Sequence, residues 1–273
     1  MRIARFTANG QTSYGLVEGD SVTPIEGDLF GARRPAGNPV PLSSVKLLAP
    51  VVPRLMLAVA LNYPSHLGQQ TASPRPELFV KGINTLANPG DAIPMPAGCE
   101  RVDYEGELVA VIGRRCSRVS VAEALSYVYG YTCGNDVSAR DWQRGDQQWF
   151  RGKGCDMFGP IGPWNVDGHD PTNLNLSTRL TGEEVQRCNT GEMIHSVAET
   201  VSFVSRVCAL EPGDVIFTGT SGQPRQLKHG DVVEVDVEGV GVLSNSFIND
   251  PNPMPWVDLR PDLRPQRTPA GAR

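Results

Sequence analysis

The sequence predicts a β-rich α+β fold. Short segments rich in Val, Ile and Leu recur along the chain and are separated by turn signals such as Asn-Gly and Pro-Gly, which is typical of many short strands. Only two segments begin with a capping box, one at Ser120 and one at Ser196, so few helices are expected. Strands that outnumber helices in this way favour an α+β arrangement over a doubly wound sheet.

The first 50 residues are predicted to form a small β-rich extension. Its strand candidates, separated by Asn-Gly and Gly-Asp turns, are Arg2–Thr7, Ser13–Glu18 and Ser21–Pro24. A connector rich in Pro and Gly, Arg33–Pro41, follows them. At the other end, residues 250–273 carry six Pro and four Arg, so we expect an extended or disordered tail, or one that lies on a partner subunit. Residues 51–249 then form the central unit.

The central unit is predicted to consist of strands with two helices among them. Its strand candidates are Leu55–Ala60, Leu78–Lys81, Val102–Gly113, Tyr131–Asp136, Val215–Thr218, Gly230–Val237 and Val240–Phe247. The first helix is predicted to begin at Ser120 and to end near Gly130. The second begins at Ser196 and places on one side Val197, Val201, Val204 and Cys208. The polar stretch Leu67–Pro76 is expected to be a loop or a short mobile helix. Arg140–Phe158, rich in polar and aromatic residues without a clear period, is expected to be a functional loop region.

Composition indicates an ordinary globular protein that binds neither nucleic acid nor membrane. The chain has 273 residues, 40% hydrophobic content and a net charge of −5, which is not the basic balance of a nucleic-acid-binding protein. No apolar run approaches the roughly 20 residues of a membrane helix, and the N-terminus has no apolar signal core. The six cysteines show no C-x-x-C spacing, so we expect reduced thiols in a cytoplasmic protein.

Three acidic residues stand at the ends of two predicted strands. Glu105 and Glu107 lie two positions apart, so they share one face, and this face continues as Val109 and Val111. Two carboxylates side by side at the end of an apolar face repel each other, so one must take a proton or a cation must lie between them. With Asp136, which follows the next apolar stretch, they offer three oxygens that suit Mg²⁺, Mn²⁺ or Ca²⁺.

The same spacing has a plainer interpretation. A solvated edge strand with both glutamates in water shows the same Glu-x-Glu pattern, and the spacing alone does not decide between the two.

An ordered series of motifs resembles the fumarylacetoacetate hydrolase family. The matching segments, in chain order, are Asn62–His66, Phe79–Lys81, Asp103–Glu107, Asn135–Asp141, Gln143, Trp149, Gly152-Lys153, Gly159–Pro163 and Pro212–Thr220. They extend from about Pro50 to Phe247 in the family's order, which is more specific than any single motif. The resemblance favours the metal interpretation of the three acids.

The resemblance implies a fold, a substrate class and an assembly. The fold is a mixed β-roll that carries the active site, with a small N-terminal domain, and the assembly is a homodimer. Members act on small 2-oxo acids and 1,3-dicarbonyl acids. We therefore expect a divalent-metal-dependent hydrolase that cleaves a C–C bond in an acylpyruvate or related 2,4-dioxo acid, through an enolate that the metal stabilises. Mg²⁺ is the expected metal, and Mn²⁺ or Ca²⁺ are alternatives.

The resemblance also implies residue roles. The expected metal ligands are Glu105, Glu107 and Asp136. The expected catalytic residues are His66, as the general base, and Lys153, which adds positive charge for the substrate carboxylate. The side chains expected to bind substrate are Arg140, Gln143, Thr220, Lys81 and Gln69. Each has a plainer alternative, since lysine and arginine are most often surface charges and a lone histidine is most often exposed.

Two departures from the family pattern bear on the reaction. Many hydrolases and decarboxylases of the family carry a glutamate three residues after the histidine, where this chain has Gln69, which cannot take a proton. The family also commonly continues Thr-Gly-Thr with Pro-x-Gly-Val, where this chain has Ser221–Arg225. Hydrolysis stays the first expectation because it is the family's broadest activity. The alternatives are a 2-oxo acid tautomerase or isomerase, a decarboxylase, and a non-catalytic metal-binding homologue.

Overall fold

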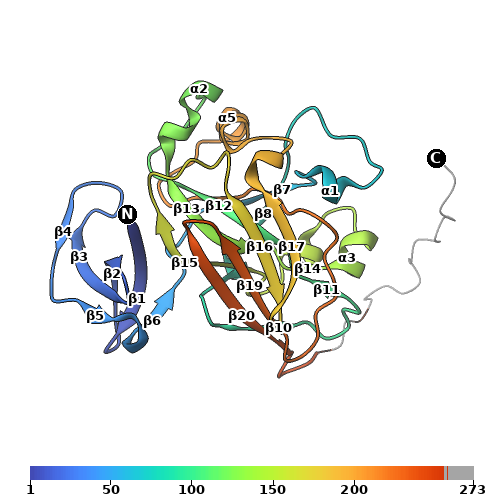
Figure 1. Cartoon of the computed structure of the whole chain (residues 1–273). Helices are drawn as coiled ribbons and strands as arrows, with labels where there is room; N and C mark the ends of the chain where they lie inside the picture. The colour runs from blue at the N-terminus through green and yellow to red at the C-terminus, as the bar shows by residue number, and fades with distance from the viewer. Residues whose placement is uncertain (255–256, 258–273) are drawn as a thin grey trace, which may run out of the picture.

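The computed structural model describes residues 1–254 and 257 and shows a molecule built mainly of β-strands (Figure 1). Most strands of the described part belong to a 13-stranded and a 5-stranded sheet. The predicted β-rich α+β class is confirmed. Most of the tail predicted at residues 250–273 lies outside the described residues.

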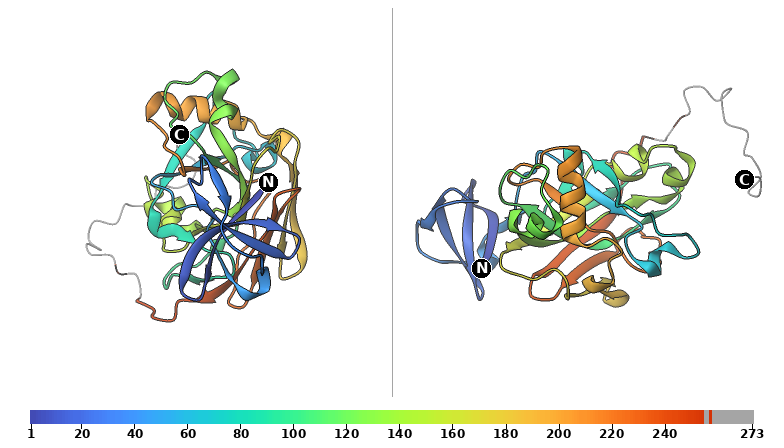
Figure 2. Two further views of the ribbon diagram at one scale, coloured as in Figure 1. Left: turned by 90° about the vertical axis from the view of Figure 1, so that its left-hand side faces the viewer. Right: turned by 90° about the horizontal axis from the view of Figure 1, so that it is seen from above.

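The N-terminal strands continue the largest sheet at one end of the molecule. They are β1 Arg2–Ala8, β2 Gln11–Glu18, β3 Ser21–Gly27, β4 Arg33–Pro35, β5 Val40–Pro41 and β6 Lys46–Leu48. Two residues of β1, Arg2 and Ile3, pair with Val166 and Asn165 of β15 (Gly159–Val166). Figure 2 shows these strands projecting as a lobe from the central unit, so hydrogen bonds of a single sheet connect the lobe to the rest.

The central part of this sheet carries the strand that supports the acidic residues. Its strands are β7 Met56–Ala60, β8 Glu77–Lys81, β9 Leu86–Ala87, β12 Gly106–Ile112, β13 Val128–Asn135, β15 and β18 Val215–Phe217. The order β15-β13-β12-β18-β7-β8 places β12 in the interior of the sheet. The pairs β13·β12 and β12·β18 are antiparallel, whereas β18·β7 is parallel, so the sheet is mixed.

The second sheet packs against one face of the first. Its strands, in spatial order, are β10 Ala92–Met95, β20 Gly241–Asn249, β19 Val232–Val237, β16 Asn175–Leu180 and β17 Glu183–Asn189. Leu108 and Ala110 of β12 share a buried cluster with Val235 of β19 and Phe247 of β20. Val109 and its neighbours on the opposite face pack in a separate cluster. β12 is therefore buried on both faces, as its dense Leu, Val and Ile content requires.

The strand predicted over Val102–Gly113 is wrong in one respect, because the chain leaves the ladder before Gly106. The segment forms β11 Val102–Asp103, which pairs with β14 Ser138–Ala139, and then β12. Between them, the backbone N–H of Glu105 donates to the side chain of Asn135 at 2.8 Å. The side chain of Asn135 thus accepts the hydrogen bond that a neighbouring strand would otherwise accept. The chain can therefore bend here without leaving the N–H of Glu105 unpaired.

The helices are few and short. They are α1 Pro64–Leu67, α2 Val121–Ala124, α3 Arg140–Gly145, α4 Phe150–Lys153 and α5 Val197–Val207, with 3₁₀ turns at Leu42–Ser44, Ile83–Thr85, Leu125–Tyr127 and Thr190–Glu192. Among the described residues, no helix is long and apolar enough to cross a membrane. All six cysteines are free thiols.

Two helix predictions need correction. The helix predicted from Ser120 to Gly130 ends at Ala124, because a 3₁₀ turn follows and β13 already begins at Val128. Cys208 does not belong to the buried side of α5: it has extended backbone at the helix end and is exposed. The capping box at Ser196 is present, and Val197, Val201 and Val204 are buried as predicted.

Replacing Ser196 by Ala is expected to lower the free energy of unfolding by about 1 kcal/mol, the usual value of an N-cap side chain. Ser196 Oγ accepts the N–H of Glu199, whose carboxylate accepts the N–H of Ser196. Urea denaturation measures the change. The matched control is Ser117→Ala, because Ser117 is exposed and has no side-chain hydrogen bond in the described part of the chain. Equal effects of the two substitutions would contradict the capping role.

Candidate metal centre and active site

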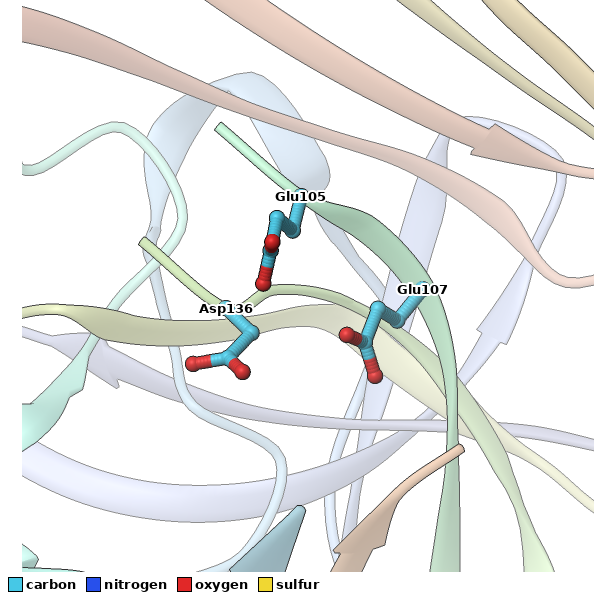
Figure 3. Close-up of side chains that lie close together, drawn as sticks. All are labelled: Glu105, Glu107 and Asp136. Carbon is cyan, nitrogen blue, oxygen red and sulfur yellow. The ribbon is translucent and has the colours of Figure 1, made fainter. Parts of the chain in front are cut away.

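Pairing of β12 with β13 brings the three acidic residues together. Glu107 lies in β12 opposite Gly134, and Asp136 directly follows β13. The backbone N–H of Asp136 donates to the carbonyl of Glu105 at 2.9 Å, which holds the two bends side by side. One oxygen of each carboxylate lies within 4.8 Å of the others, and Figure 3 shows the three side chains converging from two segments. All three are buried, with exposed fractions of at most 4%.

Buried cations neutralise two of the three acids. Lys153, the last residue of α4, contacts Glu105 Oε2 and donates to Asp136 Oδ2 at 2.6 Å. Arg140 Nη2 donates to the other oxygen of Glu105 at 2.5 Å. Lys81 approaches Asp136 from the opposite side, with Nζ 2.6 Å from Oδ1. Each carboxylate oxygen of Glu105 and Asp136 thus contacts a positive charge.

Glu107 carries the uncompensated charge of the site. Its Oε2 accepts the N–H of Gly219 at 2.7 Å, and no ion pair to it occurs among the described residues. Burial, together with the charges of Asp136 and Glu105, raises its pKa well above the usual value. Burial also disfavours the charged form of Glu105, but Lys153 and Arg140 outweigh it and hold the pKa of Glu105 below its usual range.

This donor set fits a divalent cation. Three buried carboxylate oxygens, with no sulfur or imidazole nitrogen among them, are the ligands that hard ions such as Mg²⁺ and Mn²⁺ prefer. A doubly charged ion held by Glu105, Glu107 and Asp136 would also remove the repulsion that raises the pKa of Glu107.

The nearby carboxylate of Asp103 is not available as a fourth ligand. Both of its oxygens accept hydrogen bonds from Arg101, at 2.8 and 2.9 Å. A third bond at 3.0 Å comes from Nε of Arg140. This acid therefore holds the two arginines in place beside the site.

His66 presents its Nε2 to the site, because a main-chain contact holds Nδ1. It lies in α1, and its Nδ1 is 2.6 Å from the carbonyl oxygen of Gly222. A carbonyl can only accept, so this contact places a proton on Nδ1 and leaves the lone pair of a neutral ring on Nε2. Nε2 lies 3.7 Å from Glu105 Oε1, at the edge of the acidic cluster.

A cavity of about 420 Å³ connects these groups. Of the residues predicted to contact substrate, Arg140, Gln143 and Thr220 line it, as do His66 and Lys153. Lys81 does not line the cavity, because Asp136 lies between them. Gln69 is exposed and does not line it either, whereas its neighbour Gln70 does. The cavity wall therefore differs from the prediction at these positions.

Other lining residues were not predicted. Those with polar or aromatic side chains include Phe79, Arg101, Asp103, Arg144, Trp149 and Gln223. Phe79, Asp103 and Trp149 lie within motifs that the sequence analysis quoted, so position in a motif was an available signal for them. Arg144 follows Arg140 by four residues, which is the spacing of neighbours on one helix face. Gln223 lies in Ser221–Arg225, the segment that the sequence analysis marked as a departure from the family pattern.

The comparisons with known proteins agree with this geometry. A family model described as fumarylacetoacetate (FAA) hydrolase C-terminal matches residues 56–248. The chain belongs to the fumarylacetoacetate hydrolase family. A second model, described as Rv2993c-like, N-terminal, matches residues 1–50. The resemblance inferred from the order of the motifs is thereby confirmed.

Similar members of the fumarylacetoacetate hydrolase family carry several activities in their names. Oxaloacetate tautomerase Fahd2a of Rattus norvegicus is 35% identical over 247 residues, which cover 85% of this chain and 78% of that protein. The structure of 2-hydroxyhepta-2,4-diene-1,7-dioate isomerase from Mycobacterium marinum is 37% identical, with a TM-score of 0.87 over 92% of this chain and 100% of that chain. Maleylpyruvate hydrolase from Sphingobium sp. SYK-6, in complex with manganese(II) and pyruvate, is 27% identical, with a TM-score of 0.77 and the same coverage. Family membership therefore indicates an enzyme without deciding its reaction.

Replacing Glu107 by Gln is expected to weaken Mg²⁺ and Mn²⁺ binding at least about tenfold, because the neutral amide removes one of the three anionic ligands. Isothermal titration calorimetry measures the dissociation constants. The matched control is Glu100→Gln, which removes the same charge from an exposed side chain that does not line the cavity. Unchanged affinity in the Glu107 variant would contradict the predicted ligand set.

Metal affinity is expected to rise with pH. The ionised carboxylate is the form that binds a cation, and the raised pKa of Glu107 means that it keeps its proton to a higher pH than an ordinary glutamate. Binding therefore releases a proton, and the dissociation constant falls as the pH increases through the titration of Glu107. Calorimetry in two buffers of different ionisation enthalpy measures this release, and identical heats in both would contradict it.

Replacing Gly219 by Ala is expected to reduce metal affinity without touching a ligand. Gly219 has φ +96°, and a Cβ there would lie 2.6 Å from Cβ of Asn62, so an alanine forces the segment to move. That movement withdraws the N–H that holds Glu107. Gly222→Ala is the control, because Gly222 also has positive φ but its Cβ would meet no atom within 4 Å. Equal metal affinities in the two variants would contradict this reasoning.

Proposed function

We propose that this chain is a divalent-metal-dependent enzyme that transfers a proton within a small 2-oxo acid, as a tautomerase or isomerase. The observation that carries the proposal is the environment of His66. Its Nδ1 bonds to a main-chain carbonyl and not to a carboxylate, while Nε2 faces the acidic cluster. Such a histidine suits the removal and return of one proton, a step for which no activated water is needed.

The side chains around His66 support this role. Lys153 contacts Glu105 and lines the cavity, so its ammonium group would also attract a substrate carboxylate bound next to it. A divalent ion held by the three acids would act as a Lewis acid that stabilises negative charge on the 2-oxo group. Nε2 of His66 takes a proton from C3 of the substrate, the carbon next to the 2-oxo group. In tautomerisation this proton returns to the oxygen of the 2-oxo group, and in isomerisation it returns to another carbon. Glu105, 3.7 Å away, stabilises the imidazolium between the two steps.

Hydrolysis of a C–C bond is the second candidate. It was the first expectation from the sequence, and the maleylpyruvate hydrolase with manganese(II) and pyruvate supports it as a structural neighbour. Hydrolysis requires a water molecule to be activated as well as a proton to be moved. Because Gln69 is exposed outside the cavity and Gln70 is neutral, neither provides a carboxylate partner for that water. The geometry therefore favours proton transfer alone.

We also propose that the protein acts as a homodimer in the cytoplasm, with Mg²⁺ or Mn²⁺ as its metal. Two exposed apolar side chains, Val80 and Ile83, lie on or just after β8, the last strand in the order of the large sheet, and Phe150 at the start of α4 is also exposed. A free strand edge with exposed apolar side chains favours association with another chain. Sedimentation of the wild type and of Phe150→Asp tests the assembly.

Replacing His66 by Gln is expected to lower the turnover number for tautomerisation by about 10²- to 10⁴-fold, the usual contribution of a general base, while metal affinity changes little. The assay follows enol absorbance and product together for oxaloacetate, acetylpyruvate and fumarylpyruvate with Mg²⁺. The control is His229→Gln, because His229 is exposed and outside the cavity. Release of pyruvate from acetylpyruvate would favour the hydrolase, release of CO₂ a decarboxylase, and inactivity on all three substrates a non-catalytic homologue.

A further inference from the structure

We propose that Arg144 determines substrate specificity by binding a second carboxylate, at the far end of the 2-oxo acid from the reacting carbons. This inference rests on the proposed function, which places the 2-oxo acid end of the substrate beside Glu105, Glu107 and Asp136. It adds that the substrate is a diacid whose second carboxylate lies at the cavity mouth.

The first observation is that, among the arginines of the cavity wall, the side chain of Arg144 is the one without a partner in the described part of the chain. Arg101 is bound to both oxygens of Asp103. Arg140 is bound to Asp103 and Glu105. Arg144 also lines the cavity, but its side chain has no ion pair or hydrogen bond within residues 1–254 and 257. A guanidinium that the protein does not neutralise is available to a ligand, and its planar donors match a carboxylate.

The second observation is the position of Arg144 along α3. Arg140 and Arg144 are four residues apart, so they lie on the same face of the helix, separated by about 6 Å along its axis. The side chain of Arg140 is 12% exposed and contacts the acidic cluster, whereas Arg144 is exposed to solvent. The helix thus places one arginine at the inner end of the cavity and one at the mouth.

The third observation is the charge balance of the cavity. The charged lining groups other than His66 are four cations, Arg101, Arg140, Arg144 and Lys153, and four anions, Asp103, Glu105, Glu107 and Asp136. These eight charges cancel, and Lys81, which contacts Asp136 from behind the cavity wall, adds one positive charge. With a divalent ion the site carries a positive excess, which favours a substrate with two carboxylates over one with a single carboxylate. One of these carboxylates belongs to the 2-oxo acid end, and Arg144 is the cation left for the other.

One part of the cavity wall, beside Lys153, is aromatic. Nζ of Lys153 lies 5.2 Å from the centre of the Phe79 ring, and Trp149 packs edge-on against that ring with centroids 5.2 Å apart. Both rings line the cavity. A flat apolar wall that begins at the acid end suits a planar, unsaturated carbon chain between the two carboxylates.

Calorimetry on the Mg²⁺-loaded protein tests this assignment without relying on turnover. The ligands are 2-oxobutanoate, which has no second carboxylate, and 2-oxoadipate, which carries one at the end of a six-carbon chain. The wild type is expected to bind 2-oxoadipate about five- to tenfold more tightly, as for one charge-assisted hydrogen-bonded contact near the surface. Arg144→Gln is expected to abolish this preference and to leave the affinity for 2-oxobutanoate unchanged, while Arg144→Lys restores part of it.

The matched control is Arg179→Gln, which removes the same charge from β16, where Arg179 pairs with Asp236 outside the cavity. Equal affinities of the wild type for the two ligands, or a preference that persists in Arg144→Gln, would overturn the inference and leave the proposed function intact. Failure of both ligands to bind the metal-loaded wild type would overturn both. With a diacid substrate that turns over, Arg144→Gln is expected to raise KM about five- to tenfold with kcat little changed. The reason is that it removes a contact that is equally strong in the bound substrate and in the transition state.

Discussion

The burial of three carboxylates against one another is the constraint on which the site depends. Unpaired ionised groups are too costly to bury, so this protein surrounds them with compensating charge. Lys153 and Arg140 contact Glu105, and Lys153 and Lys81 contact Asp136, which leaves the excess negative charge on Glu107. The same arrangement explains why Asp103 takes no part in the cluster, since its charge is matched by two arginines.

The two sheets must approach closely for this cluster to form. At Gly106, a Cβ would lie 2.1 Å from the hydroxyl of Thr178 in the second sheet, so only glycine fits between Glu105 and Glu107. Behind it, Gln186 of β17 donates to Thr220 at 2.6 Å, and Thr220 in turn donates to the carbonyl of Gly106 at 3.1 Å. The second sheet therefore supports the bend that carries the glutamates, although it contributes no metal ligand.

Local signals predicted much of this arrangement, and contacts between distant segments account for what they missed. The Glu-x-Glu spacing and the apolar run after it predicted that Glu105 and Glu107 share one face, but the family resemblance was needed to favour a metal site over a solvated edge strand. The break before Gly106 was not predictable, because it depends on the side chain of Asn135 in the neighbouring strand. Likewise, strand alternation allowed Lys81 to face either way, and only the pairing of β8 with β7 places it behind Asp136.

The contact between His66 and Gly222 belongs to a wider connection between two loops. Gly222 N–H donates to Ser65 Oγ at 3.0 Å, and the side chain of Gln223 donates to the carbonyl of Ser65 at 3.3 Å. The start of α1 and the loop after β18 are thus fastened to each other on the rim of the pocket. Because these bonds join the loop after β18 to α1, a change in the conformation of that loop would also change the position of the His66 ring relative to Glu105.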